Sequence, residues 1–313
     1  MINKTEATAY INNIFKVRRA NAKQKANNNL EIAFENPKFK ESFYKVRSLQ
    51  FDLSKLSEDS GDYKKITAQI EEERNTLNKE LSNCGFTKED LKPNYTCKKC
   101  NDTGFVGKTT CSCYKTEQNK LYLSESGINK TTLPSFNDVD FNVFNKNQEE
   151  IKKLYEIAKN YILKFNESKK QNIIICGKTG VGKTYLTECM LNEAVNQNIF
   201  SIYQTAFNLN QTFLEYHLAK LEQKNKILNP ILTCDLLIID DLGSENKMNN
   251  VTIEYLYLVL DTRLRNNLKT VITTNLNPDQ VQNTYEDRVF SRIFNKQVSV
   301  VVNMAGEDLR FKK

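Results

Sequence analysis

The sequence NIIICGKTGVGKTYLTECMLNEAV occupies residues 172–195 and contains the most specific pattern in the chain. It begins with a short apolar run, continues as a glycine-rich loop and ends with the composition of a helix. The loop has the form G-x-x-x-x-G-K-T, in which glycines let backbone N–H groups converge on a phosphate. The N-terminus of the following helix adds a partial positive charge. We therefore expect a strand–loop–helix unit that binds nucleotide phosphates; the alternative is a glycine-rich turn without a ligand.

Each position of this loop has an expected role in binding ATP. Lys183 is expected to reach the β- and γ-phosphates, and the Thr184 hydroxyl is expected to ligate Mg²⁺. The loop residues that we expect to contact the nucleotide or its metal are Gly177, Lys178, Thr179, Gly180, Val181, Gly182, Lys183 and Thr184. The sequence thus predicts ATP and Mg²⁺ as cofactors.

A second apolar run, LLII at 236–239, leads directly into Asp240 and Asp241. Two carboxylates at the end of a buried strand are costly unless a cation or other partners compensate them. We predict that Asp240 holds the magnesium, through water, and that Asp241 acts as the base that orients the attacking water. The alternative is an exposed acidic turn.

Five short apolar runs alternate with segments of helical length and spacing over residues 149–313. The runs are NIIIC (172–176), FSIYQ (200–204), LLIID (236–240), TVITT (270–274) and QVSVVV (297–302). Strands that are apolar throughout are typical of a parallel sheet covered on both faces. We predict an α/β domain at 149–313 with a parallel five-stranded sheet.

Two further candidates lie beyond the acidic strand. Asn275 ends the next strand and is expected to hydrogen-bond the γ-phosphate or the attacking water. In the motif EDRVFSRIF, Arg288 and Arg292 lie four residues apart on one helical face. Arg292 is our candidate for an arginine finger, a cation that stabilises the transferred phosphoryl group of a neighbouring subunit. The alternative is a pair of surface arginines that bind Glu286 and Asp287.

The front part of the chain has a different composition. Residues 1–90 are highly charged, poor in glycine and predicted to be helical, either as a self-packed hairpin or as a docking surface for another protein. Residues 91–115 are short, turn-rich and cysteine-rich, and residues 116–148 resemble a linker. We expect these three regions to precede the ATPase domain at 149–313.

Half of the eight cysteines lie in one short segment, as Cys97, Cys100, Cys111 and Cys113. The spacing C-x₂-C-x₁₀-C-x-C provides the four thiolates of a tetrahedral zinc site, and so short a segment cannot build an apolar core of its own. We predict structural Zn²⁺; free or redox-active thiols and an iron–sulfur cluster are the alternatives. Four protein ligands leave no open position, so catalysis at this metal is not expected.

Composition excludes several classes of protein. With 39% hydrophobic and 27% charged residues, the 313-residue chain is neither a disordered tail nor a membrane protein, and no apolar run approaches the ~18 residues of a spanning helix. The N-terminus lacks an apolar signal core, so we expect a cytoplasmic protein with no membrane partner. The net charge of +7 favours an acidic partner but does not by itself establish nucleic-acid binding.

The motifs GKTGVGKT, LLIIDDLGSE, TTNL and RVFSRIF, in this order, resemble the DnaC/DnaI-type helicase loaders of bacterial replication, which are AAA+ relatives of the initiator DnaA. The resemblance covers roughly residues 130–313, and a cysteine-rich element ahead of the ATPase domain resembles the DnaI-like loaders. It implies an AAA+ core with strand order 5-1-4-3-2 and ATP held between self-associated subunits. In this reading Asn275 is sensor 1 and Arg292 is the trans-acting finger.

The resemblance also implies a function. Loaders of this family deliver a hexameric replicative helicase onto single-stranded DNA during replication, and their N-terminal domain grips the helicase. The segment 207–226 resembles the family's region that contacts single-stranded DNA; a solvated amphipathic helix is the alternative. The possible contacts within this segment are His217, Lys220, Lys224 and Lys226.

Two departures from the family pattern point to slow ATP hydrolysis. Many AAA+ enzymes have glutamate where Asp241 stands, and the sequence shows no helical lid after the last strand, so that Arg310 is only a substitute for a lid-borne sensor. Two other functions stay open. One is the helper ATPase of insertion-sequence transposition, and the other is a weakly catalytic, ATP-switched DNA- or protein-binding factor.

Overall fold

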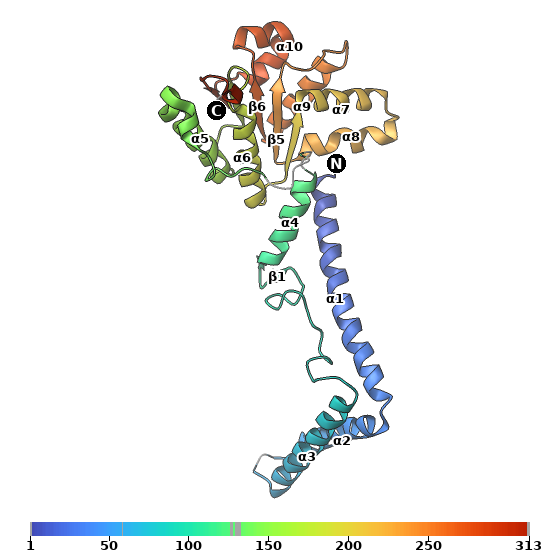
Figure 1. Cartoon of the computed structure of the whole chain (residues 1–313). Coiled ribbons are helices and arrows are strands. Elements are labelled where there is room, and N and C mark those ends of the chain that lie inside the picture. The colour runs from blue at the N-terminus through green and yellow to red at the C-terminus, as the bar shows by residue number, and fades with distance from the viewer. Residues whose placement is uncertain (1, 58, 126–127, 129–132, 312–313) are drawn as a thin grey trace. The chain divides into compact units, whose positions relative to one another are not determined.

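The computed structural model describes residues 2–57, 59–125, 128 and 133–311, which form two compact units. The N-terminal unit consists of Tyr10–Tyr114, and the sheet unit consists of Met1–Ala9 together with Lys115–Lys313. Both are visible in Figure 1, where the colours follow the chain from blue to red. Within the described residues, no helix combines the length and apolar character needed to cross a membrane.

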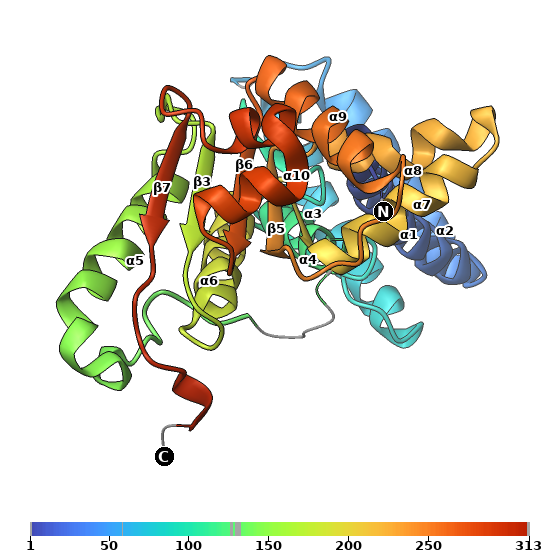
Figure 2. The same ribbon diagram turned by 90° about the horizontal axis from the view of Figure 1, so that it is seen from above.

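A parallel five-stranded sheet forms the centre of the sheet unit (Figure 2). Its order is β4 (Ser201–Thr205), β5 (Leu236–Leu242), β6 (Lys269–Thr274), β3 (Asn172–Cys176) and β7 (Ser299–Asn303). If these five strands are numbered 1 to 5 by their order along the chain and read from the β7 edge, the order is 5-1-4-3-2. The predicted order and the predicted parallel sheet are therefore confirmed. All five residues of β3 are buried, as expected for a strand covered on both faces.

Helices cover both faces of this sheet. On one face α5 (Gln148–Leu163) packs against α6 (Lys183–Asn196), and on the other α9 (Thr252–Arg265) packs against α10 (Pro278–Ile293) (Figure 2). Right-handed crossovers explain this division, because the chain reverses its direction across the sheet after β4. Further elements of this unit are α7 (Ala206–Leu218), α8 (Leu221–Thr233) and the 3₁₀ turn η2 (Leu309–Phe311).

The stretch 116–148, which we predicted to be a linker, contains regular structure. Helix α4 (Ser112–Glu125) extends into it, and the 3₁₀ helix η1 (Phe141–Asn147) ends it. Tyr122 of α4 is buried, and its ring centroid lies 4.8 Å from that of Phe200. Residues 126–127 and 129–132 of this stretch lie outside the described residues. The helix escaped detection because single aromatic contacts, and not a periodic stripe, hold it in place.

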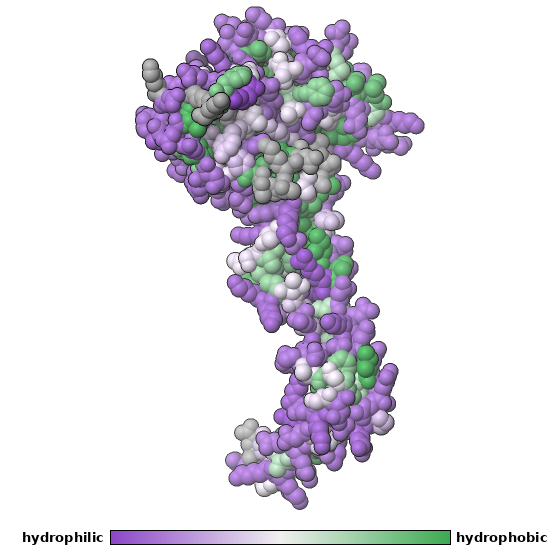
Figure 3. Space-filling view, in the orientation of Figure 1, coloured by the Kyte–Doolittle hydropathy of each residue, from purple (hydrophilic) through white to green (hydrophobic). Residues whose placement is uncertain are grey.

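The N-terminal unit has little core. It contains most of α1 (Lys4–Phe34), together with α2 (Pro37–Leu53), α3 (Gly61–Asn83) and a two-stranded hairpin, β1 (Phe105–Val106) and β2 (Thr109–Thr110). Helices α2 and α3 pack together as the predicted hairpin, around a small cluster that includes Phe39 and Leu81. Hydrophilic residues cover most of the visible face of this unit (Figure 3).

The first residues of α1 belong to the sheet unit. Ala7 is fully buried in the core of that unit, and Lys4 Nζ lies 2.8 Å from Asp235 Oδ2. Nothing in residues 2–9 predicts this, because the partners lie more than two hundred residues away along the chain.

Candidate nucleotide-binding site

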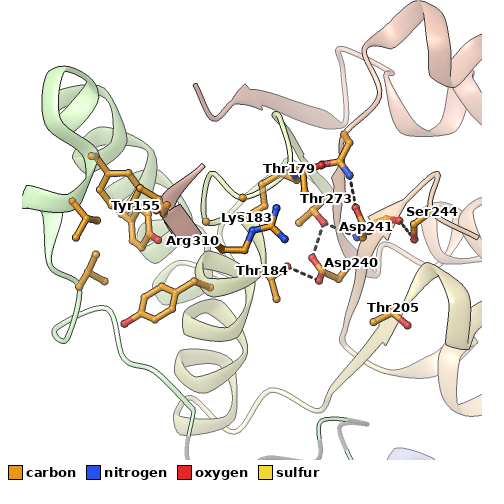
Figure 4. Close-up of a pocket in the computed structure, with 18 of the residues that line it drawn as sticks. Tyr155, Thr179, Lys183, Thr184, Thr205, Asp240, Asp241, Ser244, Thr273 and Arg310 are labelled. Carbon is orange, nitrogen blue, oxygen red and sulfur yellow. Dashed lines mark hydrogen bonds between the residues drawn. The ribbon is translucent and has the colours of Figure 1, made fainter. Parts of the chain in front are cut away.

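A cavity of about 870 Å³ lies at the carboxyl edge of the sheet, around the glycine-rich loop (Figure 4). Ligands of open parallel sheets bind at this edge, where loops and helix N-termini converge. The residues that line the cavity include Val139, Val143, Phe144, Tyr155, Lys183, Thr184, Asp240, Asp241, Thr273, Asn275 and Arg310. Five of the eight predicted loop residues, the acidic pair and Asn275 therefore share one pocket, whereas Gly177, Lys178 and Val181 are not among the residues that line it.

The loop that precedes α6 has the geometry of a phosphate cradle. Gly180 and Gly182 have φ values of 80° and 102°, a region open mainly to glycine, and Gly182 caps α6. At Gly177 a Cβ would lie 2.5 Å from the carbonyl oxygen of Met304, so only glycine fits. These positions turn the backbone so that the N-terminus of α6 faces the cavity.

Lys183 is almost fully buried at the floor of the cavity. Its ammonium group donates to the carbonyl oxygens of Gly177 at 2.8 Å and Lys178 at 2.9 Å, and to Asn275 Oδ1. Burial lowers the pKa of Lys183, and the charges of Asp241 and Asp240 oppose that shift. The loop thus holds a cation where phosphate oxygens would arrive.

Asp240 is the centre of a hydroxyl network. Its Oδ2 accepts hydrogen bonds from Thr184 at 2.8 Å and Tyr203 at 2.7 Å, and its Oδ1 accepts one from Thr273 at 2.6 Å. The carboxylate is nearly inaccessible to solvent. Burial raises the pKa of Tyr203, and the negative charge of Asp240 raises it further. Thr184 Oγ1 and Asp240 Oδ2 are hard oxygen ligands side by side, the donor set that Mg²⁺ prefers.

Asp241 is directed by an irregularity in β5. The register shifts between Ile239 and Leu242, and Asp241 has φ of 59°, in the left-handed region. Such strain is found at functional sites, where it re-aims a side chain. The Asp241 N–H donates to Thr273 Oγ1 at 2.7 Å, and Asn275 Nδ2 donates to Asp241 Oδ1 at 2.7 Å. Asp241 and Asn275 therefore form a polar pair beside Lys183.

Sequence reasoning missed two members of this network, Tyr203 and Thr273. Each is a buried polar side chain within an apolar strand that neighbours β5 in the sheet. Such a side chain needs a partner, and this is the signal that could have identified it. Recognising the partner required the strand order as well.

The other end of the cavity is apolar and has the character of a base-binding pocket. Phe144 and Tyr155 lie with ring centroids 6.3 Å apart, near Val139 and Val143. The Tyr155 hydroxyl is buried without a hydrogen-bond partner among the described residues, and burial raises its pKa. Apolar walls with few polar groups are usual in ligand pockets.

The segment after β7 crosses the glycine-rich loop. The Leu309 N–H donates to the Gly180 carbonyl oxygen at 2.9 Å, and the Asp308 carboxylate occupies the space beside Gly180 that a Cβ would fill. Arg310 lines the cavity (Figure 4) and donates to Asp308 Oδ2 at 2.7 Å. Arg310, the candidate substitute sensor, thus lies at the nucleotide cavity, and its role stays a prediction.

The two arginines of α10 lie outside this cavity. Arg292 Nη2 lies 2.9 Å from Asp261 Oδ1 and 3.1 Å from the Tyr257 hydroxyl, both on α9. Burial acts to raise the pKa of Asp261, but hydrogen bonds from Arg292 and Arg265 lower this pKa overall.

The principal partner of Arg288 is Glu254 of α9, and hydrogen bonds from this arginine lower the pKa of Glu254. Of the two pairings expected in the alternative, the one with Glu286 is present, with Arg288 Nε 3.4 Å from Glu286 Oε2. No ion pair of Asp287 is found among the described residues, and Asp287 accepts from Gln282. Both arginines thus attach α10 to α9.

The segment 207–226 forms α7, the start of α8 and the turn between them. His217 Nδ1 lies 3.0 Å from the Tyr255 hydroxyl, and Lys224 Nζ lies 5.1 Å from the ring centroid of Tyr216. Lys220 precedes α8, and Leu221 beside it is 85% exposed. The predicted contacts thus surround an exposed turn.

We call residues 91–115 the cysteine segment. Its four cysteines converge in the N-terminal unit. Their Sγ atoms all lie within 4.8 Å of one another, with Cys97 and Cys111 at 3.8 Å and Cys100 and Cys113 at 3.5 Å. Tetrahedral zinc with Zn–S bonds of ~2.3 Å requires sulfurs about 3.8 Å apart, so the thiols fit the ion. The backbone of Cys100 and the Cys113 thiol lower the pKa of Cys97 to about 7, whereas burial and the neighbouring thiols raise the pKa of Cys113.

Residues 117–313 match the family described as IstB-like ATP binding protein. The chain belongs to this family. Membership places it among the P-loop ATP-binding proteins of AAA+ type, in agreement with the predicted fold and with ATP as the predicted nucleotide.

The predicted similarity to helicase loaders is confirmed by relatives of this IstB-like chain. It is 28% identical over 142 residues to the replicative helicase loader DnaI of Bacillus subtilis (strain 168), covering 43% of this chain and 44% of that protein. It is 25% identical over 138 residues to the replicative helicase loader DnaC of Escherichia coli (strain K12), covering 44% of this chain and 55% of that protein. The chain thus spans about half the length of these relatives.

A solved structure titled as that of DnaI is similar over 56% of this IstB-like chain and 90% of its own, with 24% sequence identity and a TM-score of 0.44. Because the match is limited to part of the chain, activities and partners of these proteins are proposals for this one.

Proposed function

We propose that the chain is an ATP-dependent loader that delivers a hexameric replicative helicase onto single-stranded DNA in the cytoplasm. The observation that carries this proposal is the similarity to two proteins named as replicative helicase loaders. The presence of a separate N-terminal unit supports it, because such a factor needs one surface for its partner and another for ATP.

The nucleotide pocket has the groups that ATP hydrolysis requires. The loop and Lys183 would bind the phosphates, and Thr184 and Asp240 would hold Mg²⁺, which neutralises phosphate charge when bound. Asp241, oriented by Asn275, would accept a hydrogen bond from the attacking water and later its proton. Because aspartate is shorter than the glutamate that many AAA+ enzymes have at this position, we propose slow turnover.

The remaining group comes from a second copy of the chain. Arg292 lies outside its own nucleotide cavity, and its side chain remains 31% exposed despite the pair with Asp261. In a ring or filament of subunits it would stabilise the γ-phosphoryl group bound next door. Self-association through the ATP site is therefore part of the proposal.

We also propose one structural Zn²⁺ on the cysteine segment. The convergent thiols support this, and so do the two backbone N–H groups, of Thr96 and Cys97, that bind the buried carboxylate of Asp102 and fix the loop. The ion would stabilise a segment that has almost no apolar core of its own.

The test is co-purification with the replicative helicase of the same organism. We expect wild-type protein to retain the helicase, and Lys183→Ala to change its ATP dependence without abolishing it, because the contact lies in the N-terminal unit. A variant that lacks residues 10–114 should lose the helicase. Failure of the wild-type protein to bind the helicase, with or without ATP, would contradict a loader.

A second candidate is the ATP-dependent helper of insertion-sequence transposition. The family match over residues 117–313 favours it, because that family is named after an insertion-sequence protein. A parallel pull-down with the transposase encoded beside such an element separates the two. Retention of the transposase but not the helicase would replace the loader proposal with this one.

A further inference from the structure

The positive charge of the chain is concentrated in two segments that pack together in the N-terminal unit. Residues 10–34 and the cysteine segment each contain five basic residues and one acidic residue, a net charge of +4 each, against +7 for the whole chain. Residues 37–83, which contain α2 and α3, have nine basic and nine acidic residues. The excess therefore belongs to α1 and the cysteine segment, and a four-thiolate zinc site would offset only part of it.

A groove runs between these two segments. One wall is formed by Lys16, Arg19 and Lys23 of α1, and the other includes Thr103 and Phe105. With 3.6 residues per turn, the three cations lie within about 60° of one another and are about 4.5 and 6 Å apart along the helix axis. None of the three forms an ion pair with any residue that the structure describes. They form an unneutralised cationic row.

The opposite wall presents a fixed aromatic ring. Phe105 is 47% exposed, and its ring centroid lies 5.4 Å from that of Tyr114, which stacks on Phe15 of α1 at 5.3 Å. The backbone is held as well, because the Phe105 N–H donates to Thr103 Oγ1. At Gly104 a Cβ would lie 2.7 Å from the Tyr114 ring. Phe105 is therefore a rigid platform with an accessible face.

The acidic residue that lines the groove does not neutralise the row. Asp102 is fully buried, and its carboxylate accepts the backbone N–H groups of Thr96 and Cys97 at 2.8 Å each. Its charge is thus engaged within the loop. Lys98, Lys99 and Lys108 are exposed on the same segment and extend the positive surface.

We propose that this groove binds single-stranded nucleic acid, with the α1 cations on backbone phosphates and Phe105 stacked on a base. Cations that track a backbone, combined with an aromatic ring under a base, are the two components of sequence-tolerant single-strand binding. An acidic protein segment would also pair with the cations, but it would leave the fixed ring without a contact. This site is separate from the ATP pocket and from segment 207–226, and it does not depend on helicase loading.

The test uses the full-length zinc-loaded protein and a fluorescein-labelled 20-nucleotide oligothymidylate, with anisotropy measured over a range of salt concentrations. In the triple variant Lys16→Gln, Arg19→Gln, Lys23→Gln, the slope of log affinity against log salt should fall by about 2, since each lost contact contributes ~0.7. Phe105→Ala should weaken binding roughly tenfold. The matched control is the triple variant Lys64→Gln, Lys65→Gln, Arg74→Gln on α3, which should match wild type.

A second measurement needs no variant. An oligonucleotide containing 5-iodouracil, crosslinked to the wild-type protein by light, should label the peptide that contains Phe105. The proposal is overturned if all crosslinks lie in the sheet unit. It is equally overturned if the groove variant keeps the wild-type salt slope, or if polyglutamate, and not the oligonucleotide, depends on the three cations.

Discussion

Asp240 accepts hydrogen bonds from three hydroxyl groups, and these come from α6, β4 and β6. When Mg²⁺ binds, Thr184 would turn towards the ion, whereas Tyr203 and Thr273 would keep the carboxylate in place. A carboxylate that hydrogen bonds already hold in position binds a metal ion more tightly than a mobile carboxylate, because it loses less conformational freedom on binding. We therefore propose that Tyr203 positions Asp240, the predicted metal ligand.

Tyr203→Phe should weaken Mg²⁺-dependent ATP binding, because a hydrogen bond to a charged group is worth roughly 1.5–3 kcal/mol. The measurement is a Mg²⁺ titration of ATP binding, in which the half-saturating Mg²⁺ concentration should rise about tenfold. Tyr155→Phe is the control, since it removes a phenolic hydroxyl from the same cavity without touching Asp240. An equal shift in both variants would show that Tyr203 has no special role.

At the scale of single residues the sequence predicted the groups that belong to motifs. Lys183, Thr184, Asp240, Asp241 and Asn275 share one cavity, although their roles stay predictions. Motifs work here because phosphate and metal chemistry restrict both residue type and spacing. Tyr203 could not be found in this way, because its contact with Asp240 depends on which strand lies beside β5.

Helices α9 and α10 form an arginine-bearing pair. Two arginines of α10 bind two carboxylates of α9, and Tyr285 of α10 hydrogen-bonds Glu245, which follows the acidic strand. Directly after Tyr285 the helix is interrupted at Glu286, which has φ of 65°. The segment with Arg288 and Arg292 thus follows a bend in α10, and Tyr285, directly before that bend, is hydrogen-bonded to the residue Glu245 beyond the acidic strand.

If Arg292 acts on the neighbouring subunit, two inactive variants should complement each other. Arg292→Ala and Lys183→Ala should each lose most ATPase activity, by ~10³ or more for the finger. An equimolar mixture should recover part of the activity, since some interfaces combine an intact loop with an intact arginine. The measurement is steady-state phosphate release, with Arg288→Ala plus Lys183→Ala as the comparison pair. Without recovery in the Arg292 mixture, the trans role is excluded.

At the scale of elements the apolar runs identified all five strands to within two residues at each end. Buried strands are the easiest elements to find, because few other segments are apolar throughout. Helix α4 was missed because its buried tyrosines in the described residues, Tyr114 and Tyr122, lie eight residues apart, and two such contacts produce no periodic stripe. The bend at Glu286 has no local signal either, because glutamate rarely has a positive φ.

The two units depend on different sources of stability. The sheet unit has a large core, whereas the cysteine segment relies on contacts of Tyr114 with α1 and on its four thiols. Loss of a zinc ion should therefore affect one unit and spare the other.

Purified protein should contain about one equivalent of zinc, measured by mass spectrometry of the metal. Removal of zinc by a chelator should raise amide hydrogen exchange over residues 91–115 and leave ATP binding within about twofold, since no cysteine of the cluster lines the ATP cavity. The substitutions Cys97→Ser and Cys100→Ser should reproduce the effect, and Cys84→Ser should not. Less than half an equivalent of zinc would eliminate the site.

The contact of residues 2–9 with the sheet unit makes the N-terminal unit an insertion in topological terms, since the chain leaves the ATPase core through α1 and re-enters it through α4. A protease that cleaves once within the inserted unit would leave two fragments still held together by Ala7 and the Lys4–Asp235 pair. A recombinant fragment that starts at residue 117, where the family match begins, would lack residues 2–9. It would therefore expose the apolar surface of the sheet unit that these residues cover. Fragments intended for crystallisation or nucleotide assays should therefore replace residues 10–114 with a short connector and keep both flanking ends.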